Sequence, residues 1–277
     1  MELRSIFEKI IEPKLMNAAD LALKSIPRTL KRPLPQHFPL ISHRGAYSNP
    51  HYVENTLEAF NWCRRNSFWG VELDIRWTKD KVPVVHHDEQ PLRTFNKSFK
   101  ISEVSFQELR RQTAKIPTLQ EVIEQFSNDF HFMIELKTDS QSSVKQWCWQ
   151  DDILKDILAP LEPGPRYHIM GFNTDRLGQM GFLPGEAKMA ISHLAPWTTF
   201  NDCQEKGIGN LAGQSLLLSP ALRTDAKRMG IKIGAGFIAS KNALIRELNL
   251  GCDFFFTNDP IHIQQSFEIL RLHSLKL

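Results

Sequence analysis

Residues 70–87 have the sequence GVELDIRWTKDKVPVVHH, and this stretch decides the fold. Two strand-like segments, 70–76 and 82–87, are joined by only five residues. A parallel connection needs about a dozen residues or more, so these two segments are expected to form an antiparallel hairpin. Only the first of them is then free to take part in a larger parallel sheet.

The turn of this hairpin determines which residues face one another. If Asp80 and Lys81 centre the turn, His87 lies opposite Asp74. A turn shifted by one residue puts His87 nearer Glu72. In either register the second arm brings His87 back beside the two acids.

The chain from residue 38 onward alternates short apolar strands with helical patterns, which predicts a parallel sheet with helical crossovers. The expected strands are 38–43, 70–76, 82–87, 130–136, 166–172, 187–193, 214–219, 230–237 and 253–257. With the second hairpin arm set aside, eight strands remain, the number of a TIM-type (β/α)8 barrel. Residues 38–277 are therefore assigned to an α/β barrel domain. Residues 88–117 lack a strand–helix unit and are expected to form an excursion over the active face.

The composition fits one ordinary globular domain. The 277 residues are 42% hydrophobic and 23% charged, and the net charge is only +3. This small charge gives no support for a nucleic-acid partner. The cysteines are far apart and form neither zinc-ligand spacing nor a disulfide framework; they are Cys63, Cys148, Cys203 and Cys252.

Residues 1–37 are expected to form a short helical prefix followed by a Pro-rich linker. Apolar residues recur there at helical spacing: Leu3, Ile6, Phe7, Ile10 and Ile11. Packing of this helix on the barrel and weak contact with a membrane surface are both open alternatives. No apolar core of a signal peptide and no spanning segment is present, so a cytoplasmic location is expected. The oligomeric state is left open.

The strongest indication of chemistry is that charged side chains are expected to point into the predicted barrel. Strand alternation sends the aliphatic residues toward the outer helices, so Glu72, Asp74, Glu135 and Lys137 point inward. Three inward acids repel one another unless a positive charge is near. An all-oxygen donor set suits a hard cation, Mg²⁺ or Ca²⁺. The alternative is a network that Lys137 and Arg44 satisfy without a metal.

Two further motifs lie at strand ends, where the active face of such a barrel is built. His43 and Arg44 end the first strand, and Gly45 allows a sharp turn after them. His87 ends the hairpin. Histidines can act as acid and base near neutral pH, and arginine binds phosphate oxygens in a fork. Together with the acids, this set suits phosphoryl transfer.

The ordered motifs of residues 40–137 resemble the glycerophosphodiester phosphodiesterase family. The matching runs are His43-Arg44-Gly45-Ala46, Glu54-Asn55-Thr56, Glu72-Leu73-Asp74, Pro83-Val84-Val85-His86-His87-Asp88 and Ile134-Glu135-Leu136-Lys137. Near the C-terminus, Thr257-Asn258-Asp259-Pro260 is similar to the closing strand of the family.

The resemblance implies metal-dependent hydrolysis of a small glycerophosphodiester to glycerol 3-phosphate and an alcohol. It implies one divalent cation held by Glu72, Asp74 and Glu135. It further implies that His43 and His87 are the acid–base pair, with Arg44 and Lys137 on the phosphate. The glycerol hydroxyl next to the phosphate would attack phosphorus, and water would then open the cyclic phosphate.

The chain departs from the family in the run 233–239, where the usual tryptophan and polar residue are missing. Further candidates for the pocket are Glu54, His193 and Trp197. Trp197 is expected on a loop after the fifth strand, where it either replaces that aromatic, contacts a lipid tail or simply packs on the rim. Two other functions therefore stay open: lysophospholipase D activity on a lipid, and an inactive barrel that binds a phosphodiester or a protein.

Overall fold

The computed structural model describes residue 26 and residues 28–137 and 144–274. In this part of the chain, eight parallel strands close a barrel in the order β1-β9-β8-β7-β6-β5-β4-β2, and β2 pairs with β1. They are β1 Leu40–Ser42, β2 Gly70–Trp77, β4 His131–Leu136, β5 Tyr167–Gly171, β6 Lys188–Ser192, β7 Asn210–Gln214, β8 Lys232–Gly236 and β9 Phe254–Thr257. The predicted (β/α)8 barrel is confirmed.

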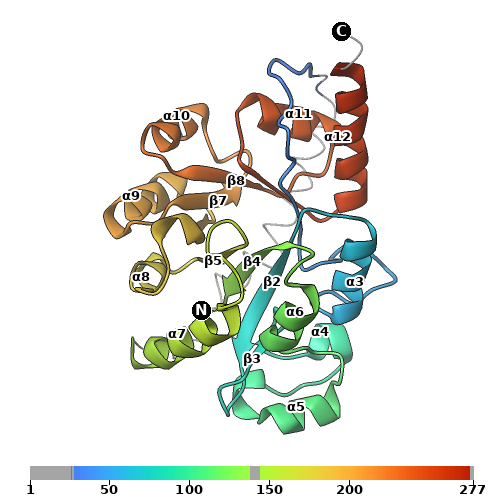
Figure 1. Ribbon diagram of the computed structural model, residues 1–277, viewed down its shortest axis with the longest axis vertical. Coiled ribbons are helices and arrows are strands. Elements are labelled where there is room, and N and C mark those ends of the chain that lie inside the picture. The colour runs from blue at the N-terminus through green and yellow to red at the C-terminus, as the bar shows by residue number, and fades with distance from the viewer. Residues whose placement is uncertain (1–25, 27, 138–143, 275–277) are drawn as a thin grey trace.

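Helices surround the barrel strands (Figure 1). They are α3 Leu57–Arg65, α4 Leu92–Phe95, α5 Phe106–Gln112, α6 Leu119–Phe126, α7 Val144–Leu158, α8 Thr174–Gly178, α9 Pro196–Lys206, α10 Pro220–Arg228, α11 Lys241–Asn249 and α12 Pro260–Ser274, with short 3₁₀ turns η2 Ile101–Glu103 and η3 Gly185–Ala187. Side chains in the sequence set where several begin. Thr118 and Glu121, for example, form a reciprocal capping box at the start of α6. No helix in the described residues is long and apolar enough to cross a bilayer.

The core has two layers, as the strand alternation predicts. Leu73, Ile75 and Ile134 are fully buried between the sheet and the helices. A second apolar cluster lies apart from this layer and draws its residues from six barrel strands: Ile41, Met133, Met170, Met189, Ala212, Phe254 and Phe256. Glu72 and Asp74 alternate with the outer-layer residues of β2, so their side chains point to the inside of the barrel.

The hairpin is present, and of the two expected registers it has the one shifted by one residue from a turn centred on Asp80 and Lys81. β3 (Pro83–Val85) pairs antiparallel with β2, and Ile75 faces Val85. The N–H of Thr78 donates to the carbonyl of Val82, and the N–H of Val82 donates to the Thr78 hydroxyl, so Asp80 alone is at the centre of the loop. The main-chain carbonyl of Asp74 therefore accepts from the N–H of His86, not of His87.

The strand predicted at 214–219 was wrong by about four residues. β7 is Asn210–Gln214, and its pairing with β6 and β8 fixes that position. Asn210 is polar but fully buried, because its side-chain amide donates to the carbonyls of Glu186 and Lys188 at 2.9 and 2.8 Å. The leucine run after β7 resembles a strand, yet it forms the turn before α10.

The two segments outside the repeating units are only partly described. Of the predicted prefix and linker, residues 1–25 and 27 lie outside the described residues. The carbonyl of Thr29 and the N–H of Lys31 bond to Asn249 of α11, so the described linker lies on the barrel. The excursion 88–117 packs on β3 through a separate small apolar cluster.

The connection from β1 to α3 depends on unusual backbone angles. Arg44, Gly45 and Asn55 have φ of 50°, 72° and 57°. A Cβ at Gly45 would lie 3.0 Å from the Phe60 ring, so glycine is required by both its angle and its close packing. This turn places Arg44 over β2, where the main-chain carbonyl of Arg44 accepts from the N–H of Asn55 at 2.9 Å.

Replacing Gly45 by alanine should therefore destabilise the fold more than the same change at Gly230. Gly230 has the same φ of 72°, but a Cβ there would meet no atom within 4 Å. The angle alone should cost Gly230→Ala about 1–2 kcal/mol, and Gly45→Ala should add the cost of displacing Phe60. Urea unfolding measures both free energies, and equal losses would contradict the close packing at Gly45.

Candidate active site

Three buried carboxylates meet at the C-terminal half of the barrel. Glu72 and Asp74 come from β2 and Glu135 comes from β4, and all three are less than 9% exposed. The two strands pair in parallel with Asp74 beside Glu135. One oxygen from each of the three lies within 4.8 Å of the others. Such a group is costly to bury without positive charge.

Two cations lie against these acids. Lys137 Nζ is 2.8 Å from Asp74 Oδ1 and 2.5 Å from Glu135 Oε1. Arg44 Nε is 3.3 Å from Asp74 Oδ2, and the Arg44 N–H donates to Glu72 Oε2 at 2.9 Å. The ion-pair network that the sequence left as an alternative is thus present. It still leaves three carboxylates facing two cations.

The directions of the pKa shifts reflect the presence of three carboxylates beside two cations. Burial would raise the pKa of Asp74, yet Lys137, His87 and Arg44 together hold it well below its usual range. Burial and the charges of Asp74 and Glu135 raise the pKa of Glu72 well above its usual range. Asp74 is therefore firmly ionised, whereas Glu72 favours a proton in the absence of a further cation.

His43 lies at the end of β1 with its ring against the acids. Its Nε2 is 3.7 Å from Glu72 Oε2, and its Nδ1 is 2.7 Å from Asn258 Oδ1. Because an amide oxygen only accepts, Nδ1 carries the hydrogen and Nε2 keeps its lone pair. Burial and then the charge of Arg44 lower the pKa of His43 well below its usual value. The ring is therefore neutral and can accept a proton.

His87 follows the hairpin and is more open to solvent than His43. Its Nδ1 is 2.8 Å from Asp88 Oδ1, and Arg93 Nε donates to the other oxygen of Asp88 at 2.8 Å. Asp88 thus fixes the ring and leaves Nε2 available for a substrate. After Lys137, His87 is one of the charges that lower the pKa of Asp74.

His86 and Glu54 belong to the supporting structure of the site. The His86 ring is buried, with Nδ1 2.8 Å from the Asp88 carbonyl and Nε2 3.0 Å from Thr94 Oγ1. Glu54 accepts from Arg44 at 3.0 Å and from Arg93 at 2.6 and 3.0 Å. Glu54 therefore joins the β1 turn to the excursion instead of presenting a free carboxylate.

Three positioning residues escaped the sequence reasoning. Asn258 orients His43, Arg93 reaches from the excursion to Glu54, and Asn55 donates to Asp74 Oδ2 at 2.7 Å. Asn55 and Asn258 lie in runs that the family motifs contain. The pattern of residue types along the sequence did not predict which groups these three residues contact.

The two remaining pocket candidates lie on another side of the mouth. His193 follows β6 and stacks on Phe172, with ring centroids 4.0 Å apart. The prediction of a loop around Trp197 was wrong, because α9 begins at Pro196 and Trp197 is in its first turn. Trp197 packs edge-on against Phe200, with centroids 5.9 Å apart, and remains 43% exposed.

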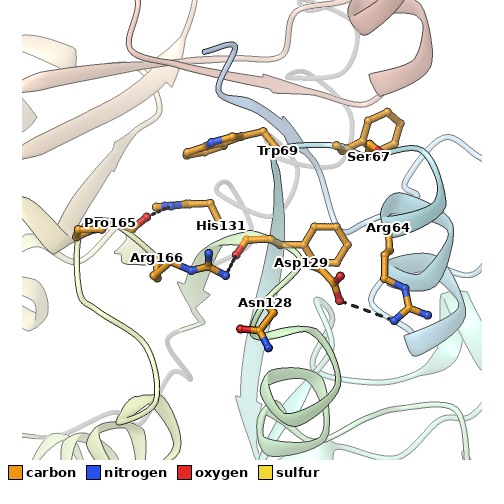
Figure 2. A pocket seen from close by; sticks show the side chains of 10 residues that line it. Arg64, Ser67, Trp69, Asn128, Asp129, His131, Pro165 and Arg166 are labelled. Carbon is orange, nitrogen blue, oxygen red and sulfur yellow. Dashed lines mark hydrogen bonds and ion pairs between the residues drawn. The ribbon is translucent and has the colours of Figure 1, made fainter. Parts of the chain in front are cut away.

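A pocket of about 450 Å³ lies at the opposite end of the barrel (Figure 2). Its charged groups are engaged locally: Arg64 is 3.8 Å from Asp129, and Arg166 donates to main-chain carbonyls. Trp69 stacks on His131, and burial lowers the pKa of that histidine to about 4. The pocket has no cluster of carboxylates, and this end of such barrels generally serves stability.

Comparison with known proteins assigns the chain to a family. The glycerophosphoryl diester phosphodiesterase family profile matches residues 43–233. A glycerophosphodiester phosphodiesterase of Caldanaerobacter subterraneus is 26% identical over 237 residues, which are 80% of this chain and 94% of that protein. One from Bacillus altitudinis is 27% identical over 163 residues, 55% of this chain and 65% of its own length.

The fold has close solved counterparts. The structure of an Oleispira antarctica phosphodiesterase in complex with the product sn-glycerol-3-phosphate matches with a TM-score of 0.73 at 24% identity, covering 85% of this chain and 97% of the other. The family profile covers more than half of the chain and includes the carboxylates, both histidines and both cations described above. The chain therefore belongs to the glycerophosphoryl diester phosphodiesterase family.

Proposed function

We propose that this protein hydrolyses glycerophosphodiesters to glycerol 3-phosphate and an alcohol, with a divalent cation and two histidines. The observation that supports this most is the group of three buried carboxylates beside Arg44 and Lys137. Three carboxylates beside only two basic side chains are suited to bind a metal ion, and the two basic side chains are suited to bind a phosphate. The family assignment supports the same reaction.

The residues present fit a hard divalent cation. Glu72, Asp74 and Glu135 offer only oxygen atoms, within 4.8 Å of one another. The raised pKa of Glu72 has the repulsion among these acids as a cause, and a cation would relieve it. We propose Mg²⁺ or Ca²⁺. When bound, the cation would polarise a phosphate oxygen and lower the pKa of the attacking hydroxyl.

Arg44 and Lys137 would bind the phosphate of the substrate. Both now lie against carboxylates, and both side chains are mostly buried, so their charges are poorly screened. With the carboxylates neutralised, these two cations would be left with charge to share with phosphate oxygens. Neutralisation of the phosphate is the main contribution a protein can make to phosphoryl transfer.

His43 and His87 would move the protons. The neutral His43 ring takes the proton of the glycerol hydroxyl at Nε2 as that oxygen forms a bond to phosphorus. His87 gives its Nε2 proton to the departing alcohol oxygen as the phosphorus–oxygen bond breaks. In the second step His87 accepts a proton from water, and His43 returns its proton to the glycerol oxygen of the opening cyclic phosphate.

Two alternative functions share some of these features. Lysophospholipase D activity retains the chemistry and changes the substrate, and the exposed Trp197 beside the mouth favours it. An inactive barrel that binds a phosphodiester or a protein would need none of the histidine arrangement. The position of His43, with a lone pair on Nε2 toward the acids, counts against that second alternative.

Glu72→Gln should weaken binding of Mg²⁺ or Ca²⁺ by roughly 10–100-fold or more, because a charged oxygen donor becomes a neutral one. Isothermal titration of the metal alone measures this without any assay of activity. Glu268→Gln, which removes an exposed acid on α12, is the matched control and should bind like the parent. An unchanged titration for Glu72→Gln would remove this residue from the metal site.

His43→Ala and His87→Ala should each reduce turnover of glycerophosphocholine by roughly 10²–10⁴-fold, the usual value of acid–base help. The measurement is release of glycerol 3-phosphate with Mg²⁺, with Ca²⁺ and with EDTA. His262→Ala changes an exposed histidine on α12 and serves as control. Full activity in either variant contradicts the acid–base roles, whereas an inert parent protein at every metal concentration favours the binding barrel.

A further inference from the structure

The pocket at the N-terminal end of the barrel is large enough to hold a small organic molecule. Its volume is about 450 Å³, within the usual range of roughly 300–1,000 Å³ for small-molecule sites. The α3–β2 loop supplies Ser67 and Trp69 to its lining, the α6–β4 loop supplies Asn128 and Asp129, and the α7–β5 loop supplies Arg166 (Figure 2). These loops precede their strands, whereas the three carboxylates lie toward the other strand ends, so the pocket is separate from the candidate active site.

One wall of the pocket is rigid and carries no charge of its own near neutral pH. The Trp69 ring stacks on the His131 ring, with centroids 4.4 Å apart and planes 12° apart. His131 is fixed in turn, because its Nδ1 is 3.0 Å from the carbonyl of Pro165 and its Nε2 is 2.8 Å from His168 Nδ1. Burial and then the charge of Arg166 lower the pKa of His131 to about 4, and burial lowers the pKa of His168 to about 3. Both rings are therefore neutral at pH 7, and the wall is a preformed surface.

The charged side chains that line the pocket leave an excess of positive charge. Arg64 and Arg166 have one carboxylate between them, Asp129, among the described residues of the lining. Arg166 Nη2 donates to the main-chain carbonyls of Ser127 and Phe130. These partners are neutral, so they hold the guanidinium in place and leave its charge uncancelled.

The ion pair between Arg64 and Asp129 is loose enough for a ligand to replace it. Arg64 Nη1 and Asp129 Oδ2 are 3.8 Å apart, longer than a hydrogen bond, and the two side chains are 46% and 32% exposed. Arg64 Nη2 donates to Asn61 Oδ1 at 2.7 Å, and the guanidinium lies 5.6 Å from the centre of the Phe126 ring. The side chain is thus positioned at the pocket, while the exposed pair with Asp129 contributes little free energy.

We propose that this pocket binds a phosphate monoester of a sugar or polyol, with the phosphate on Arg64 and Arg166. The planar guanidinium groups match phosphate oxygens, and a phosphate would satisfy the charge that Asp129 leaves over. The volume has room for more than a phosphate ion, so the ligand carries an organic body. The exposed side chains of Ser67 and Asn128 offer hydrogen bonds to the hydroxyl groups of that body. Binding here requires neither a metal ion nor the proposed reaction.

Isothermal titration of the full-length protein with glucose 6-phosphate tests this site. The ligand should bind with a dissociation constant below roughly 1 mM. Glucose lacks the phosphate, and inorganic phosphate lacks the organic body. Each of these two comparison ligands should therefore bind at least roughly tenfold more weakly than glucose 6-phosphate.

Two variants of the loose ion pair should change the affinity in opposite directions. Arg64→Gln removes a charged donor and should weaken the binding of glucose 6-phosphate roughly tenfold. Asp129→Asn removes the carboxylate that competes for Arg64 and should tighten the binding by up to roughly fivefold, the usual worth of an exposed ion pair. Both side chains are partly open to solvent, so both proteins should fold. Arg65→Gln changes the next residue of α3, which does not line the pocket, and should bind like the parent.

Each of three results would overturn the proposal. A parent protein that does not bind glucose 6-phosphate has no such site. Equal affinity for inorganic phosphate would show that the organic body makes no contact. Binding that neither Arg64→Gln nor Asp129→Asn alters would place the ligand elsewhere on the protein, for example on Arg44 and Lys137, and would leave the proposed function standing.

Discussion

Asp74 is the residue on which the site depends, because it holds the two cations Lys137 and Arg44 inside the barrel. Lys137 contacts one of its oxygens, and Arg44 and Asn55 contact the other. Burial makes each of these charges expensive alone, so the acids and the bases require one another. The same arrangement holds both a cation site and a phosphate site, since the acids attract metal while Arg44 and Lys137 attract anions. The turn after β1, whose backbone has positive φ at Arg44 and Gly45, places Arg44 in this group.

The fold could be read from the sequence because barrel strands have two opposite faces. Alternation placed Glu72, Asp74 and Glu135 inside and their neighbours outside, and the short connection after β2 required a hairpin. The strand at 214–219 was misplaced because a leucine run resembles a buried strand more than Asn210–Gln214 does. The side-chain NH₂ of Asn210 donates to carbonyls of a neighbouring segment, and local sequence does not reveal these partners.

The sequence predicted which residues belong to the site, but it did not predict which of them contact one another. The sequence left two registers of the hairpin open, and only the pairing of Ile75 with Val85 decides between them. The partner of His43 is Asn258, which is 215 positions away and comes near only when β9 closes the barrel against β1. Arg93 likewise depends on how the excursion folds back. These contacts follow from closure of the sheet, so periodicity and motif spacing carry no signal for them.

The measurement that tests the central claim most directly is anomalous diffraction from crystals grown with Mn²⁺ and glycerol 3-phosphate. The account requires one anomalous peak among the carboxylates of Glu72, Asp74 and Glu135. It also requires the phosphate to contact Arg44 and Lys137. An ion bound elsewhere, or a phosphate remote from these two cations, would show that the acid cluster is a structural ion-pair network and contradict the account.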